Sequence, residues 1–261
     1  MTDHTCDLAL ALTLADTADR ITLDRAAAAD LRVEAKPDRT PVTDADLAVE
    51  DAIRAVLRVH RPRDAVVGEE RGGPSGHAGR AWLLDPIDGT KNFLRGVPVW
   101  ATLIALVEDG TPVMGVISAP ALRRRWWAAT EAGAHTRDPD GTSRAITVSG
   151  VGDLADAYLS TTDLGSWTEH RSRESYLSLV DATWESRAFG DFWQHCLVAE
   201  GVIDLAAEPI VNPWDVAAVQ VLVQQAGGRF TDLDGVARYD GGTALSSNGL
   251  LHDAALTLLQ S

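Results

Sequence analysis

Two short apolar segments of this chain each run directly into acidic residues, and this pattern limits the folds open to it. Residues 65–67 (AVV) precede Gly68 and two glutamates, and residues 81–84 (AWLL) precede the segment 85–90 (DPIDGT). Short apolar runs bounded by turn-forming residues are typical of buried strands. Two strands that end in acids place those acids at one edge of a sheet, where α/β proteins tend to build their sites. The pattern predicts a carboxylate-rich site at such an edge.

The remaining periodicity predicts an α/β (α+β) fold. Residues 7–29 and the segment from Thr43 to Pro62 have apolar residues at helical spacing. Successive antiparallel strands are expected over 99–107, 113–119 and 125–129. Beyond Ser149 strands and helices alternate: strands over 158–160, 184–187 and 203–206, and helices over 171–180, 192–200, 214–226 and after Leu250.

We expect two domains that share an interface. Residues 1–150 would form an N-terminal α+β domain with the antiparallel sheet and most metal ligands. Residues 151–261 would form a C-terminal α/β domain with the residues that select the substrate. The Gly/Pro-rich stretch 71–80 is expected to be a surface loop.

Composition excludes several classes of function. With 45% hydrophobic residues the chain can bury a core, while 23 basic against 38 acidic residues give a net charge of −15. This charge disfavours binding to nucleic acid or to anionic membranes. The two cysteines lie far apart without zinc-ligand spacing, and neither a signal peptide nor a membrane-spanning apolar run is visible. A cytoplasmic location is the default expectation.

The segment 85–90 carries the most informative group of residues. Asp85 and Asp88 flank a bend fixed by Pro86, and magnesium prefers oxygen ligands such as one or two carboxylates. Gly89 would allow the backbone to approach an anion, and a helix beginning at Thr90 would offer free amides to a phosphate. The alternative is an ordinary turn, because Asp-Pro and Asp-Gly pairs are common in turns.

Two further acidic positions favour a metal site. Glu69 and Glu70 follow the preceding strand, and Asp215 opens the helix that follows Pro213. Alone, the glutamates would be a solvated strand end and Asp215 an ordinary helix-start acid. Together with Asp85 and Asp88 they describe a metal cage.

The order and spacing of these motifs resemble the inositol monophosphatase-like superfamily. The resemblance rests on the segments 36–46 (KPDRTPVTDAD), 68–70 (GEE), 85–90 (DPIDGT) and 214–215 (WD), and it extends from the first helix to the last. It implies a magnesium-dependent phosphatase of small phosphate monoesters, built as a layered α-β-α-β-α sandwich of the inositol monophosphatase/fructose-1,6-bisphosphatase type. It also implies a homodimer and two to three Mg²⁺ ions per active site.

The resemblance also implies roles for individual residues. A first magnesium would be held by Glu69, Asp85 and the backbone carbonyl of Ile87, and a second by Asp85, Asp88 and Asp215. A third, weaker ion would lie near Glu69 and Asp46, with Lys36 and Glu70 in support. Thr90 and Asp46, with Glu69, would activate the attacking water, and the amides of Gly89 and Thr90 would hold the phosphate.

Residues outside this cage point to a cationic substrate. Glu208 matches a position that contacts the alcohol portion of the substrate in relatives, and Asp191 adds a carboxylate after Gly190. Such acids would pair with the ammonium and imidazole groups of L-histidinol phosphate, which inositol phosphate lacks. The segments 96–101, 124–129 and 247–253 resemble actinobacterial histidinol-phosphate phosphatases of the superfamily. On that resemblance Asn248 would contact the imidazole, while Arg187 and Asp88 would help to shape the pocket.

Other interpretations stay open at this point. Asp191 could cap a helix, Glu208 could be a solvated loop acid, and Arg187 could be the ion-pair partner of a strand end. The substrate could be inositol phosphate, a nucleotide bisphosphate or a sugar bisphosphate, and the fold could serve a non-catalytic regulator. Trp126 and Trp127 cannot both face one side of a strand, so at least one is expected in a core or an interface.

Overall fold

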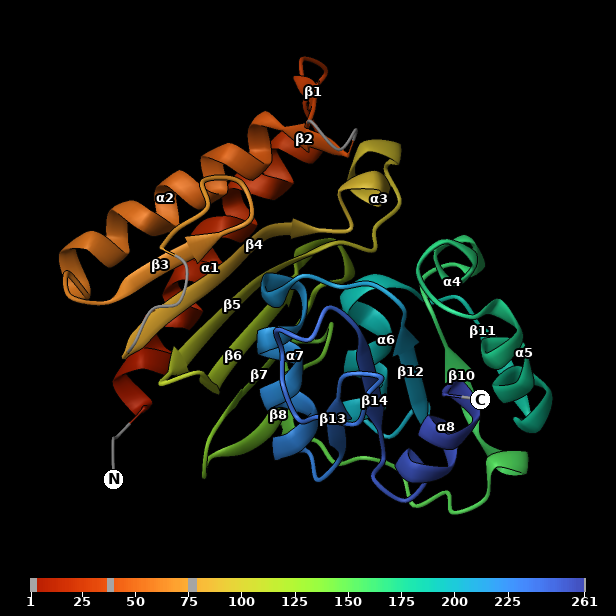
Figure 1. Cartoon of the computed structure of the whole chain (residues 1–261). Helices are drawn as coiled ribbons and strands as arrows, with labels where there is room; N and C mark the ends of the chain where they lie inside the picture. The colour runs from red at the N-terminus through yellow and green to blue at the C-terminus, as the bar shows by residue number, and fades with distance from the viewer. Residues whose placement is uncertain (1–3, 37–39, 75–78, 261) are drawn as a thin grey trace.

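The computed structural model describes residues 4–36, 40–74 and 79–260. Its helices and two larger sheets stack in five layers, α-β-α-β-α, as the resemblance implied (Figure 1). Parts of two segments discussed above, residues 37–39 and 75–78, lie outside the described residues. Within the described residues, no helix is both long enough and apolar enough to cross a membrane.

The larger sheet lies in the N-terminal half and has the order β3-β4-β5-β6-β7-β8-β9. β3 and β4 run parallel, and each later pair is antiparallel. The strands are β3 (Ala65–Gly68), β4 (Arg80–Asp88), β5 (Ala101–Glu108), β6 (Thr111–Ala119), β7 (Arg124–Ala129), β8 (Gly133–Arg137) and β9 (Ser143–Ala145).

The smaller sheet lies in the C-terminal half and has the order β11-β10-β12-β14-β13. β10 runs parallel to both β11 and β12, whereas β14 is antiparallel to its two neighbours. The strands are β10 (Tyr158–Ser160), β11 (Glu185–Arg187), β12 (Leu205–Glu208), β13 (Arg229–Thr231) and β14 (Ala244–Ser247). A separate hairpin pairs β1 (Val33–Ala35) with β2 (Pro41–Thr43).

Three helical layers cover the faces of these sheets (Figure 1). The outer pair packs on the larger sheet, the middle pair lies between the two sheets, and the remaining long helices cover the smaller sheet. The outer pair is α1 (Thr5–Ala26) and α2 (Asp44–His60), and the middle pair is α6 (Asp191–Ala199) and α7 (Pro213–Gln225). The helices on the smaller sheet are α4 (Leu164–His170), α5 (Arg173–Ala182) and α8 (His252–Leu259). The short helix α3 (Thr90–Arg95) follows β4.

The apolar pattern of β4 explains how the larger sheet is covered on both faces. Trp82 and Leu84 pack toward α1 and α2, whereas Ala81 and Leu83 pack toward α6 and α7. Because successive side chains of a strand point to opposite faces, a run of apolar residues is buried on both sides. α7 is apolar over most of its surface for the same reason, since it lies between two sheets.

Most predicted elements are present, and two boundaries need correction. β4 does not end at Asp85 but continues to Asp88 through an irregular step. The helix predicted over 171–180 is α5, and the shorter α4 precedes it. Strands β1, β2, β8, β9, β13 and β14 were not predicted. The division at residue 150 stays a prediction, although α6 and α7 share one core cluster with the larger sheet.

Candidate active site

The carboxyl end of β4 carries a bulge that sets the positions of Asp85 and Asp88. Asp85 pairs with Leu103 and Asp88 with Ala101, so three steps along β4 oppose two along β5. Thr102 donates its hydroxyl hydrogen to the Pro86 carbonyl over 2.7 Å and holds the extra residue in place. Bulges of this kind re-aim side chains near functional sites.

Asp88 joins the N-terminal half of the chain to α6. The Phe192 amide at the start of α6 donates to Asp88 Oδ2 over 2.7 Å. This contact brings the segment 85–90 next to Asp191, whose charge acts on Asp88. The carboxylate cluster, which consists of Asp46, Glu69, Asp85, Asp88 and Asp215, is therefore assembled from both halves of the chain.

Glu69 and Glu70 reach the same region from β3. Because β3 runs parallel to β4, Gly68 lies opposite Leu84, and the Glu69 amide donates to the Leu84 carbonyl over 3.1 Å. The Lys36 ammonium lies 2.6 Å from Glu69 Oε1 and 2.7 Å from Glu70 Oε1. The structure thus brings Lys36 to the glutamates, as the resemblance implied.

Two helix starts contribute one aspartate each. Asp46 and Asp215 both occupy the third position of a capping box, in α2 and α7 respectively. Asp46 Oδ2 accepts from the Thr43 amide and hydroxyl at 2.8 and 2.6 Å, and Asp215 Oδ2 accepts from the Asn212 amide at 2.7 Å. Each box uses one carboxylate oxygen and fixes the rotamer, which leaves the second oxygen for another partner.

Mutual repulsion is the main electrostatic property of this cluster. Burial, followed by the charges of Glu69, Asp88 and Asp215, holds the pKa of Asp85 well above its usual range. Burial likewise raises the pKa of Asp88, and the charges of Asp191 and Asp215 are the next largest causes. Burial raises the pKa of Asp215 to about 7, and the charge of Glu69 adds to the effect. A cation would relieve this repulsion.

The donor set fits a hard divalent cation. Asp85 Oδ1 and Asp46 Oδ1 are buried, and neither has a hydrogen-bond partner among the described residues. Buried oxygens without a donor are costly, and carboxylate oxygens are what magnesium prefers. Within the same residues, however, no three Asp, Glu, His or Cys side chains are arranged as a finished coordination shell. Within the chain, Lys36 supplies positive charge to this site by pairing with Glu69 and Glu70.

Gly89 and Thr90 follow Asp88 at the start of α3. Gly89 has φ 84° and ψ 36°, a left-handed conformation in which an added Cβ would also lie 2.9 Å from the Val99 carbonyl oxygen. The Thr90 hydroxyl donates to the Ile87 carbonyl over 2.9 Å. Thr90 and the carbonyl expected to bind metal are therefore in direct contact.

A pocket of about 200 Å³ lies beside the cluster. Its lining includes Asp88 and Asp215 from the cluster together with Asp191, Glu208 and Lys91. The pocket therefore joins the predicted metal ligands to the residues that were predicted to select the substrate.

Asp191 and Glu208 are held in this pocket by shared partners. The Asp191 amide donates to Thr162 Oγ1 over 2.9 Å, and the Thr162 hydroxyl donates in turn to Glu208 Oε1. Gln194 Nε2 donates to the same Glu208 oxygen, and Asn92 Nδ2 donates to Asp191 Oδ2 over 3.2 Å. Asp191 is not a helix cap, because α6 is capped by Gly190 without a side-chain bond.

Glu208 is not a solvated acid. It is 6% exposed, and burial raises its pKa to about 8, with the charge of Asp191 as a further contribution. Gly190 has φ 79° and places the Asp191 amide on Thr162. Burial favours the protonated form of this carboxyl, and a positively charged group placed beside it would favour the ionised form.

Two predicted substrate residues are not brought to this pocket. Asn248 donates to Ser149 Oγ at 3.0 Å and to the Val151 carbonyl at 2.8 Å, and its Oδ1 accepts from two amides of the following turn. It follows the end of β14 that is remote from Glu208. The expected imidazole contact stays a prediction that the contacts of Asn248 within the chain do not support. Arg187 is exposed and pairs with Glu185 of its own strand, as the alternative interpretation held.

Sequence reasoning missed residues that hold the predicted ones in place. Glu50 is fully buried, and its carboxylate accepts from the amides of Glu70 and Arg71 at 2.8 and 3.2 Å. Thr162 connects Asp191 to Glu208. A charged residue on the buried stripe of an amphipathic helix was the available signal for Glu50, whereas Thr162 carries none in the sequence.

Comparison with known proteins agrees with this arrangement. The model of the inositol monophosphatase family matches residues 3–260. The histidinol-phosphatase of Mycobacterium tuberculosis is 55% identical over 98% of this chain and 98% of its own length, and that of Streptomyces coelicolor is 50% identical over 99% and 98%. An inositol monophosphatase from Zymomonas mobilis superposes over the full length of both chains with a TM-score of 0.87 and 31% identity.

Fold, site and relatives together define a phosphoric monoester hydrolase. The chain belongs to the inositol monophosphatase family.

Proposed function

We propose that this enzyme hydrolyses L-histidinol phosphate to L-histidinol and phosphate. The observation that carries the proposal is the pocket in which Asp191 and Glu208 lie beside Asp88 and Asp215. Asp191 and Glu208 would offer carboxylates to a cationic alcohol, and Asp88 directly precedes Gly89 and Thr90, the predicted phosphate site. The names of the two relatives at 55% and 50% identity support the same substrate.

The carboxylate cluster is the proposed site for two to three Mg²⁺ ions. Glu69, Asp85 and the Ile87 carbonyl would hold the first and Asp85, Asp88 and Asp215 the second, with Asp46 near a third. When bound, such ions neutralise the phosphate charge and lower the pKa of water that they coordinate. The orphaned oxygens of Asp85 and Asp46 support this assignment.

Thr90 and Asp46 are proposed to orient the attacking water and take up its proton. The Thr90 hydroxyl is already fixed by its bond to the Ile87 carbonyl. Burial raises the pKa of Asp46 to about 6, which suits a group that accepts a proton near neutral pH. The amides of Gly89 and Thr90, at the start of α3, would hold the phosphate oxygens.

The substrate's positive groups would occupy the region of Asp191 and Glu208. A cation next to Glu208 favours its ionised form and offsets the cost of its burial. Thr162, Gln194 and Asn92 hold both carboxyls in fixed positions, so little side-chain entropy would be lost on binding.

A substrate panel with Mg²⁺ titrated tests this proposal. Phosphate release from L-histidinol phosphate should exceed that from inositol 1-phosphate and from nucleotide or sugar bisphosphates.

Asp191→Asn should lower kcat/KM for histidinol phosphate about tenfold or more, since one charge-assisted hydrogen bond is lost. The effect on inositol phosphate should be much smaller. The matched control is Asp181→Asn, at an exposed acid of α5. Much faster hydrolysis of inositol phosphate would favour an inositol monophosphatase instead, and binding without turnover would favour a regulator.

We further propose a homodimer that acts in histidine biosynthesis in the cytoplasm. Trp184 is 69% exposed beside the edge strand β11 and continues a row of aromatic rings formed by Tyr158, Phe189 and Trp193. Exposed aromatic residues at a sheet edge are typical of subunit contacts.

Sedimentation measurements test the dimer. Trp184→Ser should shift the chain toward monomer, whereas Val236→Ser, at another exposed apolar residue, should not. A monomeric wild-type chain would contradict the proposal.

A further inference from the structure

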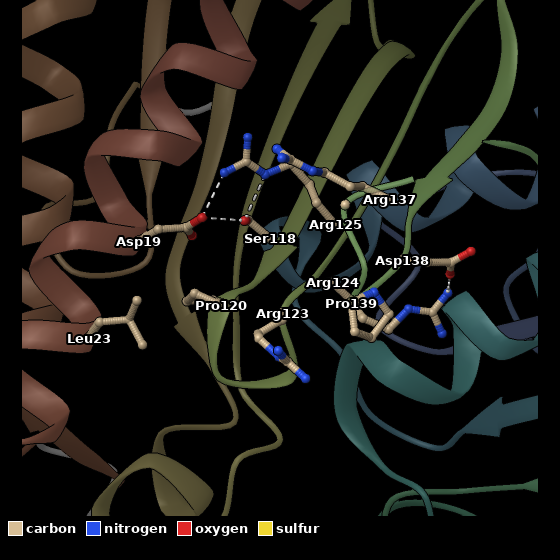
Figure 2. A pocket seen from close by; sticks show the side chains of 11 residues that line it. Asp19, Leu23, Ser118, Pro120, Arg123, Arg124, Arg125, Arg137, Asp138 and Pro139 are labelled. Carbon is tan, nitrogen blue, oxygen red and sulfur yellow. Dashed lines mark hydrogen bonds and ion pairs between the residues drawn. The ribbon is translucent and has the colours of Figure 1, made fainter. Parts of the chain in front are cut away.

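Figure 2 shows a second pocket, which has a volume of about 260 Å³. It opens between the C-terminal part of α1, the end of β6 and the turn into β7, and the end of β8. Four arginines line it, Arg123, Arg124, Arg125 and Arg137, against two acids, Asp19 and Asp138. Such a concentration of guanidinium groups is notable in a chain whose net charge is −15.

Two of the arginines are fixed by ion pairs. Arg125 Nη2 lies 2.6 Å from Asp19 Oδ2, and Arg125 Nε donates to Ser118 Oγ over 2.9 Å (Figure 2). The same Nη2 lies 2.8 Å from Asp16 Oδ1. Arg124 Nη2 lies 2.8 Å from Asp138 Oδ1 and 2.9 Å from Glu200. These contacts make one wall of the pocket rigid.

The other two arginines have free guanidinium groups. Arg123 and Arg137 are exposed, and within the described residues no acid lies within ion-pair distance of either side chain. Arg123 has φ 55°, a left-handed conformation that costs a non-glycine residue about 1 kcal/mol or more and aims its side chain from the turn. Both line the same pocket and are available to a ligand.

The positive charge left over after ion pairing comes from Arg123 and Arg137. Arg124 and Arg125 are paired with Asp16, Asp19, Asp138 and Glu200, and Arg144 shares Asp138 and Glu200 with Arg124. The planar guanidinium presents two parallel donors that match the oxygens of a phosphate.

We propose that this pocket binds a small multivalent oxyanion, such as a phosphate or diphosphate group, through Arg123 and Arg137. The volume is below the roughly 300 Å³ at which pockets begin to hold drug-sized ligands, so a compact anion fits better than a nucleotide. The site is separate from the active site, because the two pockets share no lining residue.

The two sites are nonetheless connected through the larger sheet. Ser118 of the pocket pairs with Thr102 on β5, and the Thr102 hydroxyl holds the Pro86 carbonyl in the β4 bulge.

Titration calorimetry with inorganic pyrophosphate tests the site. The full chain is stripped of divalent ions and dialysed into metal-free buffer, so that the carboxylate cluster repels the anion and cannot bind it through magnesium. We expect one pyrophosphate per chain. In Arg123→Gln/Arg137→Gln the affinity should fall about tenfold or more, because two charge-assisted contacts are lost. Phosphatase activity with Mg²⁺ should be unchanged.

The control variant removes the same charge elsewhere. Arg58→Gln/Arg238→Gln alters two exposed arginines outside the pocket and should bind as the wild type does. The variant Arg123→Lys/Arg137→Lys keeps the charge without the fork and should bind with intermediate affinity. The proposal is overturned if the wild type shows no saturable binding below about 1 mM, if both glutamine variants weaken binding equally, or if only the pocket variant changes the sedimenting mass, which would assign these arginines to a subunit contact.

Discussion

Thr90 combines two tasks within one residue. Its backbone begins α3 directly after the left-handed Gly89, and its hydroxyl donates to the Ile87 carbonyl over 2.9 Å. If this hydroxyl also orients the attacking water, its loss should affect turnover much more than metal binding.

The variant Thr90→Ala tests this separation. We expect kcat to fall about 100-fold or more, as is usual for loss of a group in proton transfer, while the Mg²⁺ concentration for half-maximal activity stays near the wild-type value. Thr130→Ala is the matched control, because Thr130 also donates its hydroxyl to a backbone carbonyl, that of Val113, but on the surface. Wild-type turnover in Thr90→Ala would remove the catalytic role.

At the residue scale, the sequence predicted groups whose chemistry is visible in their type and spacing. Asp85, Asp88 and Asp215 stand out because paired acids at strand and helix ends have few ordinary uses together. The role of Asn248 stays a prediction, because an amide can satisfy either a ligand or the backbone, and only the fold shows the four bonds that it makes within the chain. Thr162 was missed because nothing in the sequence marks it, and only the fold places its hydroxyl between Asp191 and Glu208.

At the scale of elements, the end of β3 depends on a close approach to α2. A Cβ added to Gly68 would lie 2.2 to 2.6 Å from the carboxylate atoms of Glu50. That carboxylate is held by the amides of Glu70 and Arg71 and by Arg54 Nε at 2.7 Å, so it cannot move without breaking these bonds. The glycine is therefore required by space and not by a left-handed backbone.

Gly68→Ala should accordingly disturb the loop that carries Glu69. We expect a loss of about 1–3 kcal/mol in the free energy of unfolding, typical of an overpacked site, together with weaker Mg²⁺ activation. Gly150→Ala is the control, since nothing lies within 4 Å of its added Cβ. Denaturant unfolding and a magnesium titration measure both effects. Unchanged Mg²⁺ dependence would separate Glu50 from the active site.

Elements with a strong apolar pattern were predicted, and those that depend on their neighbours were not. β4, β5 and β6 are buried on both faces, and their composition makes this visible. β9 is exposed throughout, and β13 and β14 are three and four residues long, so pairing rather than composition makes them strands. The bulge in β4 could not be inferred, because Asp-Pro in the sequence indicates a turn as readily as a bulged strand.

At the scale of the whole molecule, the stack of layers buries acids in a chain that already carries excess negative charge. Burial raises the pKa of Glu70 and Asp215 to about 7 and that of Glu208 to about 8. In the unfolded chain these groups titrate near pH 4. Between these values the folded state holds protons that the unfolded state has released, so stability falls as pH rises through 7 to 8.

The metal-free chain should therefore be less stable at pH 8.5 than at pH 6.5, by on the order of a few kcal/mol for three such groups. Burial lowers the pKa of His195 to about 3 and that of His252 to about 4. These two histidines make stability rise with pH below about pH 6.5, where the unfolded chain protonates them, and they contribute little between pH 6.5 and 8.5. Mg²⁺ should raise the Tm more at pH 8.5, where the cluster is charged, than at pH 6.5. Glu208→Gln should flatten the pH dependence of the metal-free Tm, and Asp181→Asn should leave it unchanged. A metal-free Tm that rises over this range would mean that the clustered carboxylates are already neutralised by groups such as Lys36, and that their repulsion is not what a bound cation relieves.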